Sequence, residues 1–209
     1  MATAADPVNI RTSVWLAARP ASGARRRCED PTGLDRDRIT GAAVRLLDTE
    51  GLTRFSMRRL AGGLGVTAMS LYWYVDTKHD LLELALDSAL GELTLPADSP
   101  PAGWAGRLRA LACGYRGLLA ERPWVATLAA EYPNIGPHAR AFDAALLRLL
   151  DATGLTDGGR TGAHLAVSQF LHGCGGPVRR APEDDFRFAL DVLVAGIEAK
   201  TGRQAQTGL

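Results

Sequence analysis

The stretch from Phe55 to Leu82, FSMRRLAGGLGVTAMSLYWYVDTKHDLL, predicts two short helices joined by a tight turn. Ser56 can cap the first helix by accepting a backbone N–H, and the apolar residues after it recur with helical spacing. Gly65 stands where a left-handed residue ends a helix without a Cβ penalty. Thr67 can cap the second helix, which is expected to run through Val75. The stretch therefore predicts a helix-turn-helix.

A third helix is expected to start at Thr77, because Asp80 at its third position completes a capping-box pattern. In the second helix Leu71 and Val75 are expected to face inward, which leaves other side chains pointing away from the core. These outward side chains are Met69, Ser70, Tyr72 and Tyr74. They are the candidates for contact with a partner.

The extended pattern around these helices resembles the DNA-binding half of the tetracycline repressor (TetR) family. The matching order is small-x-x-x-Leu-Ala-x-x-Leu-Gly-Val-x-x-x-x-Leu-Tyr-x-x-Val-x-x-Lys-x-x-Leu-Leu, within a run from Leu34 to about Leu86. The resemblance implies an all-α protein with an N-terminal three-helix helix-turn-helix domain. It also implies a C-terminal helical domain for ligand binding and dimerisation.

The resemblance implies two kinds of DNA contact within the motif. Hydroxyls, a helix N-terminus and an ammonium group would bind phosphates, at Thr67, Ser70, Tyr72 and Lys78. Base edges or thymine methyls would be met by Arg58, Ala68, Met69 and Tyr74, and Ser56 and Met57 complete the candidate set. The founding repressor has polar residues where Ala68 and Met69 stand, so we expect this chain to bind a different sequence.

Composition bounds the function without deciding it. The 209 residues are 46% hydrophobic, which is enough to bury the core of one large or two small domains. A net charge of +1 gives no global basic field, but residues 54–78 carry four basic side chains against one acidic side chain. Three cysteines far apart in sequence indicate free thiols in a reducing cytoplasm. No apolar run approaches the length of a membrane span, so no membrane partner is expected.

Residues 1–33 are predicted to form a disordered basic arm. Five arginines without an acid between them could touch phosphates or a minor groove; they are Arg11, Arg19, Arg25, Arg26 and Arg27. The alternatives are a solvated terminus or a start codon placed too early. The stretch LPADSPPAG, rich in proline and small residues, separates a DNA-binding domain with its connecting helix (34–95) from a regulatory and dimerisation domain (96–209).

Outside the motif, the chain is expected to contain helices only. Periodic apolar residues, prolines at helix starts and glycines at helix ends define them. The expected ranges are 35–50, 78–93, 104–119, 124–131, 137–154 and 157–171, with a final helix after Pro182. In tetracycline-binding members a histidine on the fourth helix helps to bind the drug; here that helix has only His79 at its start, so tetracycline is not implied.

Two sets of residues in the second domain are candidates for binding. The resemblance and the number of aromatic side chains favour a small-molecule pocket lined by Trp104, Leu108, Tyr115, Trp124, Leu128, Tyr132, Phe142 and Phe170. Plain core packing explains each of these residues when it is taken alone. The final helix is apolar on two sides, which predicts a partner. The resemblance implies that this partner is a second copy of the chain, bound through the last two long helices at Val167, Phe188, Val192 and Ala195.

We therefore expect a homodimeric repressor that binds a palindromic DNA operator and is released by a small molecule. One alternative is an activator or a ligand-independent regulator with the same DNA-binding domain. Another is a dimeric helical binding protein in which the helix-turn-helix is vestigial. An enzyme is not expected, because no histidine lies in a catalytic signature. His164, His172 and Cys174 could contribute metal ligands, but an ordinary helix end explains them, so no metal or cofactor is expected.

Overall fold

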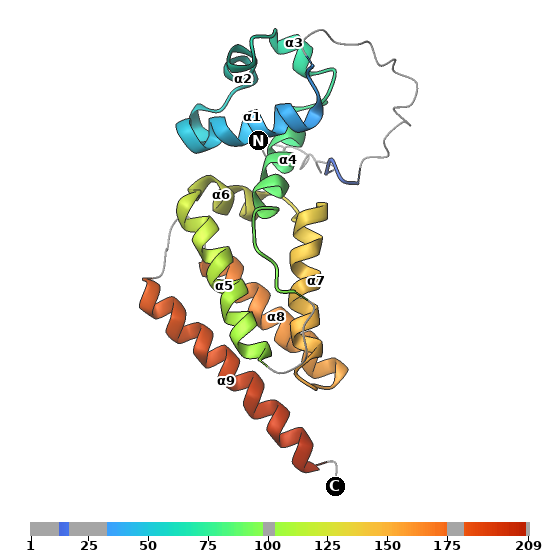
Figure 1. Ribbon diagram of the computed structural model, residues 1–209, viewed down its shortest axis with the longest axis vertical. Coiled ribbons are helices and arrows are strands. Elements are labelled where there is room, and N and C mark those ends of the chain that lie inside the picture. The colour runs from blue at the N-terminus through green and yellow to red at the C-terminus, as the bar shows by residue number, and fades with distance from the viewer. Residues whose placement is uncertain (1–12, 17–32, 98–102, 175–181, 208–209) are drawn as a thin grey trace, which may run out of the picture.

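The computed structural model describes residues 13–16, 33–97, 103–174 and 182–207, and it contains helices and no strand in these ranges (Figure 1). Its helices are α1 (Arg36–Glu50), α2 (Met57–Leu64), α3 (Ala68–Leu71), α4 (Lys78–Leu90), α5 (Trp104–Glu121), α6 (Pro123–Glu131), α7 (Pro137–Asp151), α8 (Asp157–Cys174) and α9 (Glu183–Thr207), with a 3-10 turn at Leu52–Arg54. The all-α prediction is confirmed. Except for residues 13–16 and Gly33, the predicted basic arm lies outside the described residues.

The predicted caps of the helix-turn-helix are confirmed. The side chains of Ser56, Thr67 and Thr77 each accept a backbone N–H three residues further on. Asp80 completes the capping box at Thr77, and Gly65 ends α2 in the left-handed region with a φ of 69°. Each of these features depends on residues a few positions apart, so local sequence was sufficient to predict them.

The second helix of the motif is shorter than predicted, because α3 ends at Leu71 and not at Val75. The chain continues as a turn in which the N–H groups of Tyr74 and Val75 both donate to the Leu71 carbonyl. Thr77 has to be extended in order to cap α4, so the helix must end before it. The turn still returns Val75 to the core, where the side chain is buried.

Helix α4 leaves the upper domain and enters the lower one (Figure 1). Its residues 81–87 are all buried, as expected of a helix packed between two domains. The predicted apolar stripe is present, but a second stripe, four residues apart, carries His79, Glu83 and Asp87. Glu83 and Asp87 are buried and therefore need partners, and the half-buried His79 has one too.

The three partners come from different parts of the chain. The His79 Nδ1 atom lies 2.5 Å from the Tyr132 hydroxyl, beyond the end of α6. The Ser13 hydroxyl donates to the buried Glu83 carboxylate. The contacts of His79 and Asp87 therefore hold α4 against the second domain, whereas Ser13 ties α4 to the N-terminal segment.

Asp87 caps α7 from a different helix. Its Oδ1 atom accepts the N–H groups of His138 at 3.1 Å and Ala139 at 2.9 Å. Gly136, the residue at the N-cap position, has no side chain to do this, and a Cβ there would lie 2.3 Å from the Asp87 carboxyl carbon. Glycine is therefore required by close approach, and Asp87 satisfies backbone groups that α7 cannot satisfy itself.

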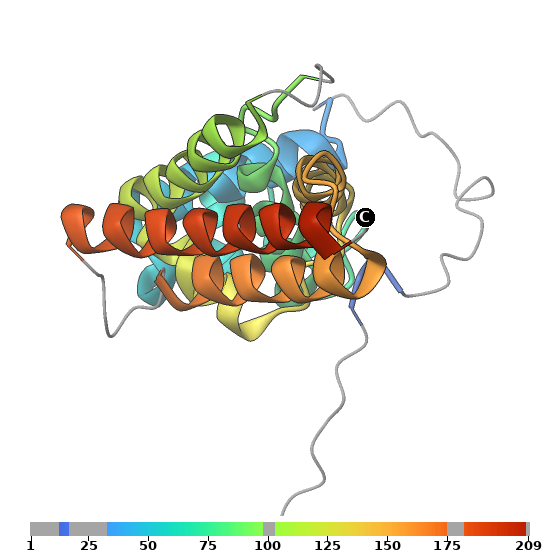
Figure 2. The ribbon, with the colours of Figure 1, turned by 90° about the horizontal axis from the view of Figure 1, so that it is seen from below.

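Helices α8 and α9 lie side by side on one face of the second domain (Figure 2). The Arg109 guanidinium pairs with Asp191 at 2.7 Å and that of Arg116 with Glu183 at 2.9 Å, which joins α9 to α5. On α9, Phe186 is buried, and so are Leu190, Val194 and Ile197 on the same face. Among the described residues, no helix combines the length and apolar character needed to cross a bilayer.

Candidate nucleic-acid interface and effector groove

The end of α3 presents three large apolar side chains to solvent. Met69 and Trp73 are each 71% exposed, and Tyr72 is 43% exposed. Beside them the Thr67 and Ser70 hydroxyls lie 2.9 Å apart at the start of the helix. Core packing does not explain this exposed set of aromatic and hydroxyl side chains, and such groups can contact phosphates and base edges.

The predicted DNA-contact residues divide into exposed and internal groups. Arg58 is exposed, Ser56 caps α2, and Ala68 and Tyr74 are half-buried against the core. Lys78 donates its ammonium to the Phe55 carbonyl at 3.1 Å and lies over the Phe55 ring. Met57 is buried, so its side chain belongs to the core and its placement in the DNA-contact set needs correction.

Sequence reasoning missed Trp73. A helix through Val75 does not single out this residue, whereas the turn after Leu71 leaves it exposed. A signal was available, because only Leu71 and Val75 in this run were expected to face inward. We call the exposed surface of the helix-turn-helix the reading head. It consists of Arg58, Met69, Tyr72 and Trp73, together with the hydroxyls of Thr67 and Ser70.

The two domains are joined by a small polar network. Asp48, near the end of α1, accepts the Trp124 indole N–H at 2.7 Å and pairs with the Arg122 Nε at 3.1 Å. A second nitrogen of Arg122 pairs with Glu92 at 2.8 Å, after the end of α4. Arg122 therefore bridges a carboxylate of the helix-turn-helix domain and a carboxylate of the connection between α4 and α5.

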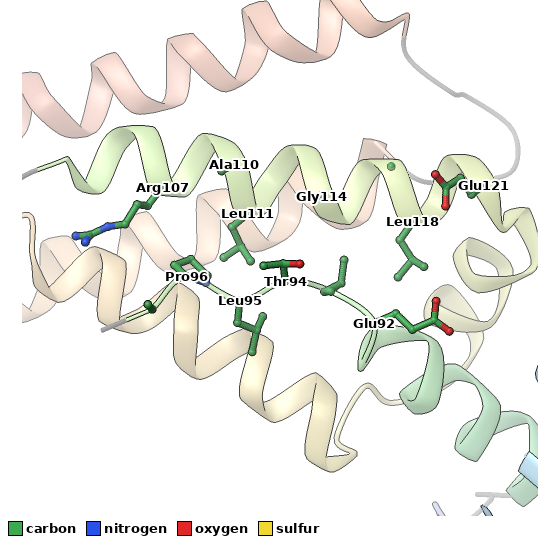
Figure 3. A pocket seen from close by; sticks show the side chains of 13 residues that line it. Glu92, Thr94, Leu95, Pro96, Arg107, Ala110, Leu111, Gly114, Leu118 and Glu121 are labelled. Carbon is green, nitrogen blue, oxygen red and sulfur yellow. The ribbon is translucent and has the colours of Figure 1, made fainter. Parts of the chain in front are cut away.

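The second domain has a groove of about 790 Å³ between α5 and residues 92–97 (Figure 3). We call it the α5 groove. Its floor is the α5 face with the small residues Ala110, Gly114 and Gly117, and leucines contribute the apolar walls. Glu92 and Glu121 lie at one end and Arg107 at the other (Figure 3). Its size is in the range of small-molecule sites.

None of the eight residues predicted to line a pocket lines the α5 groove. Trp124 and Tyr132 instead bind Asp48 and His79 at the domain junction. Leu108 and Leu128 are fully buried, and Trp104 is half-buried against the core. Phe142 packs on Tyr115 and Phe170 stacks on Phe186.

Tyr115 is a buried core residue. Burial raises the pKa of Tyr115 to about 12, because removal from water disfavours the charged phenolate. A pocket among the aromatic residues stays a prediction. The α5 groove differs from it, because small residues line its floor and charged residues lie at its ends.

The neighbouring helices α8 and α9 both carry exposed apolar residues. Phe188 is 73% exposed and Val192 is 55% exposed, and Ala195 is exposed on the same helix. Val167 is fully buried within its own subunit, so its assignment to a dimer surface needs correction. Leu165 on α8 is 60% exposed and was not predicted, because the apolar spacing of α8 assigns no face to it.

The histidines considered as metal ligands have separate partners. The His164 Nε2 atom lies 2.6 Å from Asp143, and the His172 Nδ1 lies 2.8 Å from the Ser168 carbonyl. Within the described ranges, no three histidine, cysteine or acidic side chains are grouped in a way that could hold a metal ion.

The fold and these surfaces define a class: a helical protein with an N-terminal helix-turn-helix and a larger helical second domain. Residues 39–85 match the family described as bacterial regulatory proteins of the tetR family. Residues 95–175 match the tetracyclin repressor-like C-terminal domain. The chain belongs to the TetR family of regulators.

Two curated relatives are transcriptional regulators and not enzymes. An HTH-type transcriptional regulator of Saccharopolyspora erythraea is 41% identical over 140 residues, which is 67% of this chain and 59% of the relative. The HTH-type transcriptional repressor DrrR1 of Streptomyces coeruleorubidus is 37% identical over 155 residues, 74% of this chain and 55% of the relative. The chain thus spans less than two thirds of the length of these relatives.

Solved structures are similar over nearly their whole length. The TetR family protein ActR of Streptomyces coelicolor, in complex with actinorhodin, has a TM-score of 0.68 and 26% identity, covering 81% of this chain and 99% of ActR. BioQ with its double-stranded DNA operator has a TM-score of 0.68 and 26% identity, covering 79% of this chain and 99% of BioQ.

Proposed function

We propose that this chain is a cytoplasmic, homodimeric repressor of transcription that binds a palindromic operator and is released by a small molecule. Residues 34–95 would bind the DNA, and residues 96–209 would form the dimer and bind the effector. The observation that carries the proposal is the exposed surface at the end of α3, where Met69, Tyr72 and Trp73 have no core role.

Three relatives support separate parts of this proposal. DrrR1 is described as a repressor, BioQ has been solved on its operator, and ActR has been solved with actinorhodin. Repression, operator binding and effector binding are properties of those proteins. We transfer them to this chain because both of its domains match the same family.

The exposed apolar face of α8 and α9 supports the dimer. Three large apolar side chains are exposed on these helices: Leu165, Phe188 and Val192. Exposing them to water is unfavourable in a monomer, and a second copy of the chain would cover them. A two-fold axis through such a face would place two reading heads on one DNA face. Two recognition helices enter successive major grooves when they lie about 34 to 36 Å apart, so the operator is expected to be an inverted repeat.

Selection of bound sites from random double-stranded DNA tests the proposal. We expect wild-type protein to enrich an inverted repeat. Met69→Asp should abolish retention, because it places a carboxylate opposite the DNA phosphates. Ala130→Asp adds the same charge at an exposed site on α6 and should retain DNA as wild type does. No enrichment by wild type, or equal loss in both variants, would contradict the proposal.

A further inference from the structure

The α5 groove exists because α5 carries glycines that its backbone does not need. Gly114 and Gly117 lie inside a regular helix, where glycine is less favourable than alanine. A Cβ added at either position would meet no heavy atom within 4 Å, so neither residue permits a close contact. What the two glycines provide is open space along the groove floor.

The two ends of the groove differ in charge. Glu92 and Glu121 lie at one end, and Arg107 lies fourteen residues before Glu121 on α5, which is about 20 Å along the helix axis. Between them the walls are apolar, with Leu93 and Leu95 on one side and Leu111 and Leu118 on the other. An elongated ligand with an apolar body and a cationic end matches this order of apolar and acidic groups.

The acidic end of the groove is linked to the DNA-binding domain. Glu92 pairs with Arg122, and Arg122 also pairs with Asp48 near the end of α1. A ligand ammonium beside Glu92 would compete with the Arg122 guanidinium for the same carboxylate. Loss of the pair with Glu92 would in turn change the ion pair between Arg122 and Asp48 on α1, because one guanidinium binds both carboxylates.

We propose that the α5 groove binds an amphipathic amine, with the ammonium between Glu92 and Glu121, and that this ligand controls DNA binding through Arg122 and Asp48. The ligand class and the relay extend the proposed function. The regulatory part rests on that function, whereas ligand binding by the groove does not depend on it.

Dansylcadaverine is a suitable probe, because it joins an apolar fluorescent ring to a primary amine, and its N-acetyl derivative lacks the charge. Wild-type protein should enhance and blue-shift the fluorescence of dansylcadaverine and bind the acetylated form about tenfold more weakly. Glu121→Gln should reduce this preference for the amine. Absence of binding, or equal affinity for the two probes, would overturn the ligand class.

Two matched leucine substitutions on α5 test the location. Gly114→Leu fills the groove, whereas Gly106→Leu makes the same change on α5 outside the groove lining. We expect Gly114→Leu to lose at least tenfold in affinity for dansylcadaverine and Gly106→Leu to bind as wild type. Circular dichroism should show both variants folded, since neither added Cβ meets a neighbour. Equal binding, or equal loss, in the two variants would overturn the assignment to this groove.

Asp48→Asn tests the relay, because the amide oxygen still accepts from Trp124 while the charge that holds Arg122 is lost. In wild type, dansylcadaverine should weaken binding to the selected operator. In Asp48→Asn, the probe should bind equally well but change operator affinity several-fold less. A full response in this variant would overturn the relay. If wild-type protein without the probe fails to bind DNA, the proposed function is wrong. The fluorescence titrations still show whether the α5 groove binds the amine.

Discussion

At the scale of single residues, the contact between Gly136 and Asp87 shows how one missing Cβ positions a carboxylate. Gly136→Ala places a Cβ where the Asp87 carboxyl group lies and displaces it from the N–H groups of His138 and Ala139. We expect a loss of about 2 kcal/mol in the free energy of unfolding, measured by thermal denaturation.

Gly62→Ala is the matched control for this prediction. Gly62 lies inside α2, has no neighbour within 4 Å of an added Cβ, and should therefore gain about 1 kcal/mol from higher helix propensity. A stable Gly136→Ala variant would mean that Asp87 caps α7 without the close approach seen here.

Two residues of the reading head should affect DNA binding in different ways. Tyr72→Ala should leave the fold intact, because Leu71 and Val75 carry the packing, and should weaken binding to all sequences alike. Arg58→Ala should lose about 1 to 3 kcal/mol at one base position if the exposed guanidinium binds a guanine. Titrations at fixed salt with single-base operator variants separate the two patterns, and unchanged binding by both variants would remove this surface from the DNA interface.

At the scale of elements, α4 is held by polar side chains that a connecting helix would not be expected to bury. Burial raises the pKa of Glu83 above 4.5, an effect that the hydrogen bonds from Ser13 and Val14 oppose. Since the folded protein then binds the proton more tightly than the unfolded chain, stability falls as the pH rises from 4.5 through the raised pKa.

Glu83→Gln should remove this part of the pH dependence. The slope of melting temperature against pH should be shallower than in wild type above pH 4.5. Ser13→Ala should act in the opposite direction, because it deletes a donor that favours the carboxylate. Parallel profiles for wild type and both variants would show that Glu83 does not titrate in this range.

At the scale of the whole molecule, the exposed face of α8 and α9 should decide the oligomeric state. Val192→Asp would bury an unpaired charge in the proposed dimer interface, which costs several kcal/mol and favours monomers. Operator affinity should fall too, although the reading head is unchanged. Analytical sedimentation measures the first effect, with Ala130→Asp on α6 as the control. A Val192→Asp variant that stays dimeric would exclude this face.

Local features of the chain could be predicted from the sequence. The residues that cap or end the helices of the motif make hydrogen bonds only three or four positions away, so their roles follow from the neighbouring sequence. These residues are Ser56, Gly65, Thr67 and Thr77. Apolar periodicity likewise indicated where most helices start and end, and the extended helix-turn-helix pattern indicated the family.

Only the tertiary structure decided which residues those helices bring together. Asp87 meets His138 and Ser13 meets Glu83 across 51 and 70 positions, and no local pattern specifies such pairs. Apolar spacing does not show whether a side chain such as Val167 packs within its own subunit or, like Leu165, remains exposed. The α5 groove was missed for the same reason: Gly114 and Gly117 line a groove only because residues 92–97, distant from them in sequence, lie beside α5.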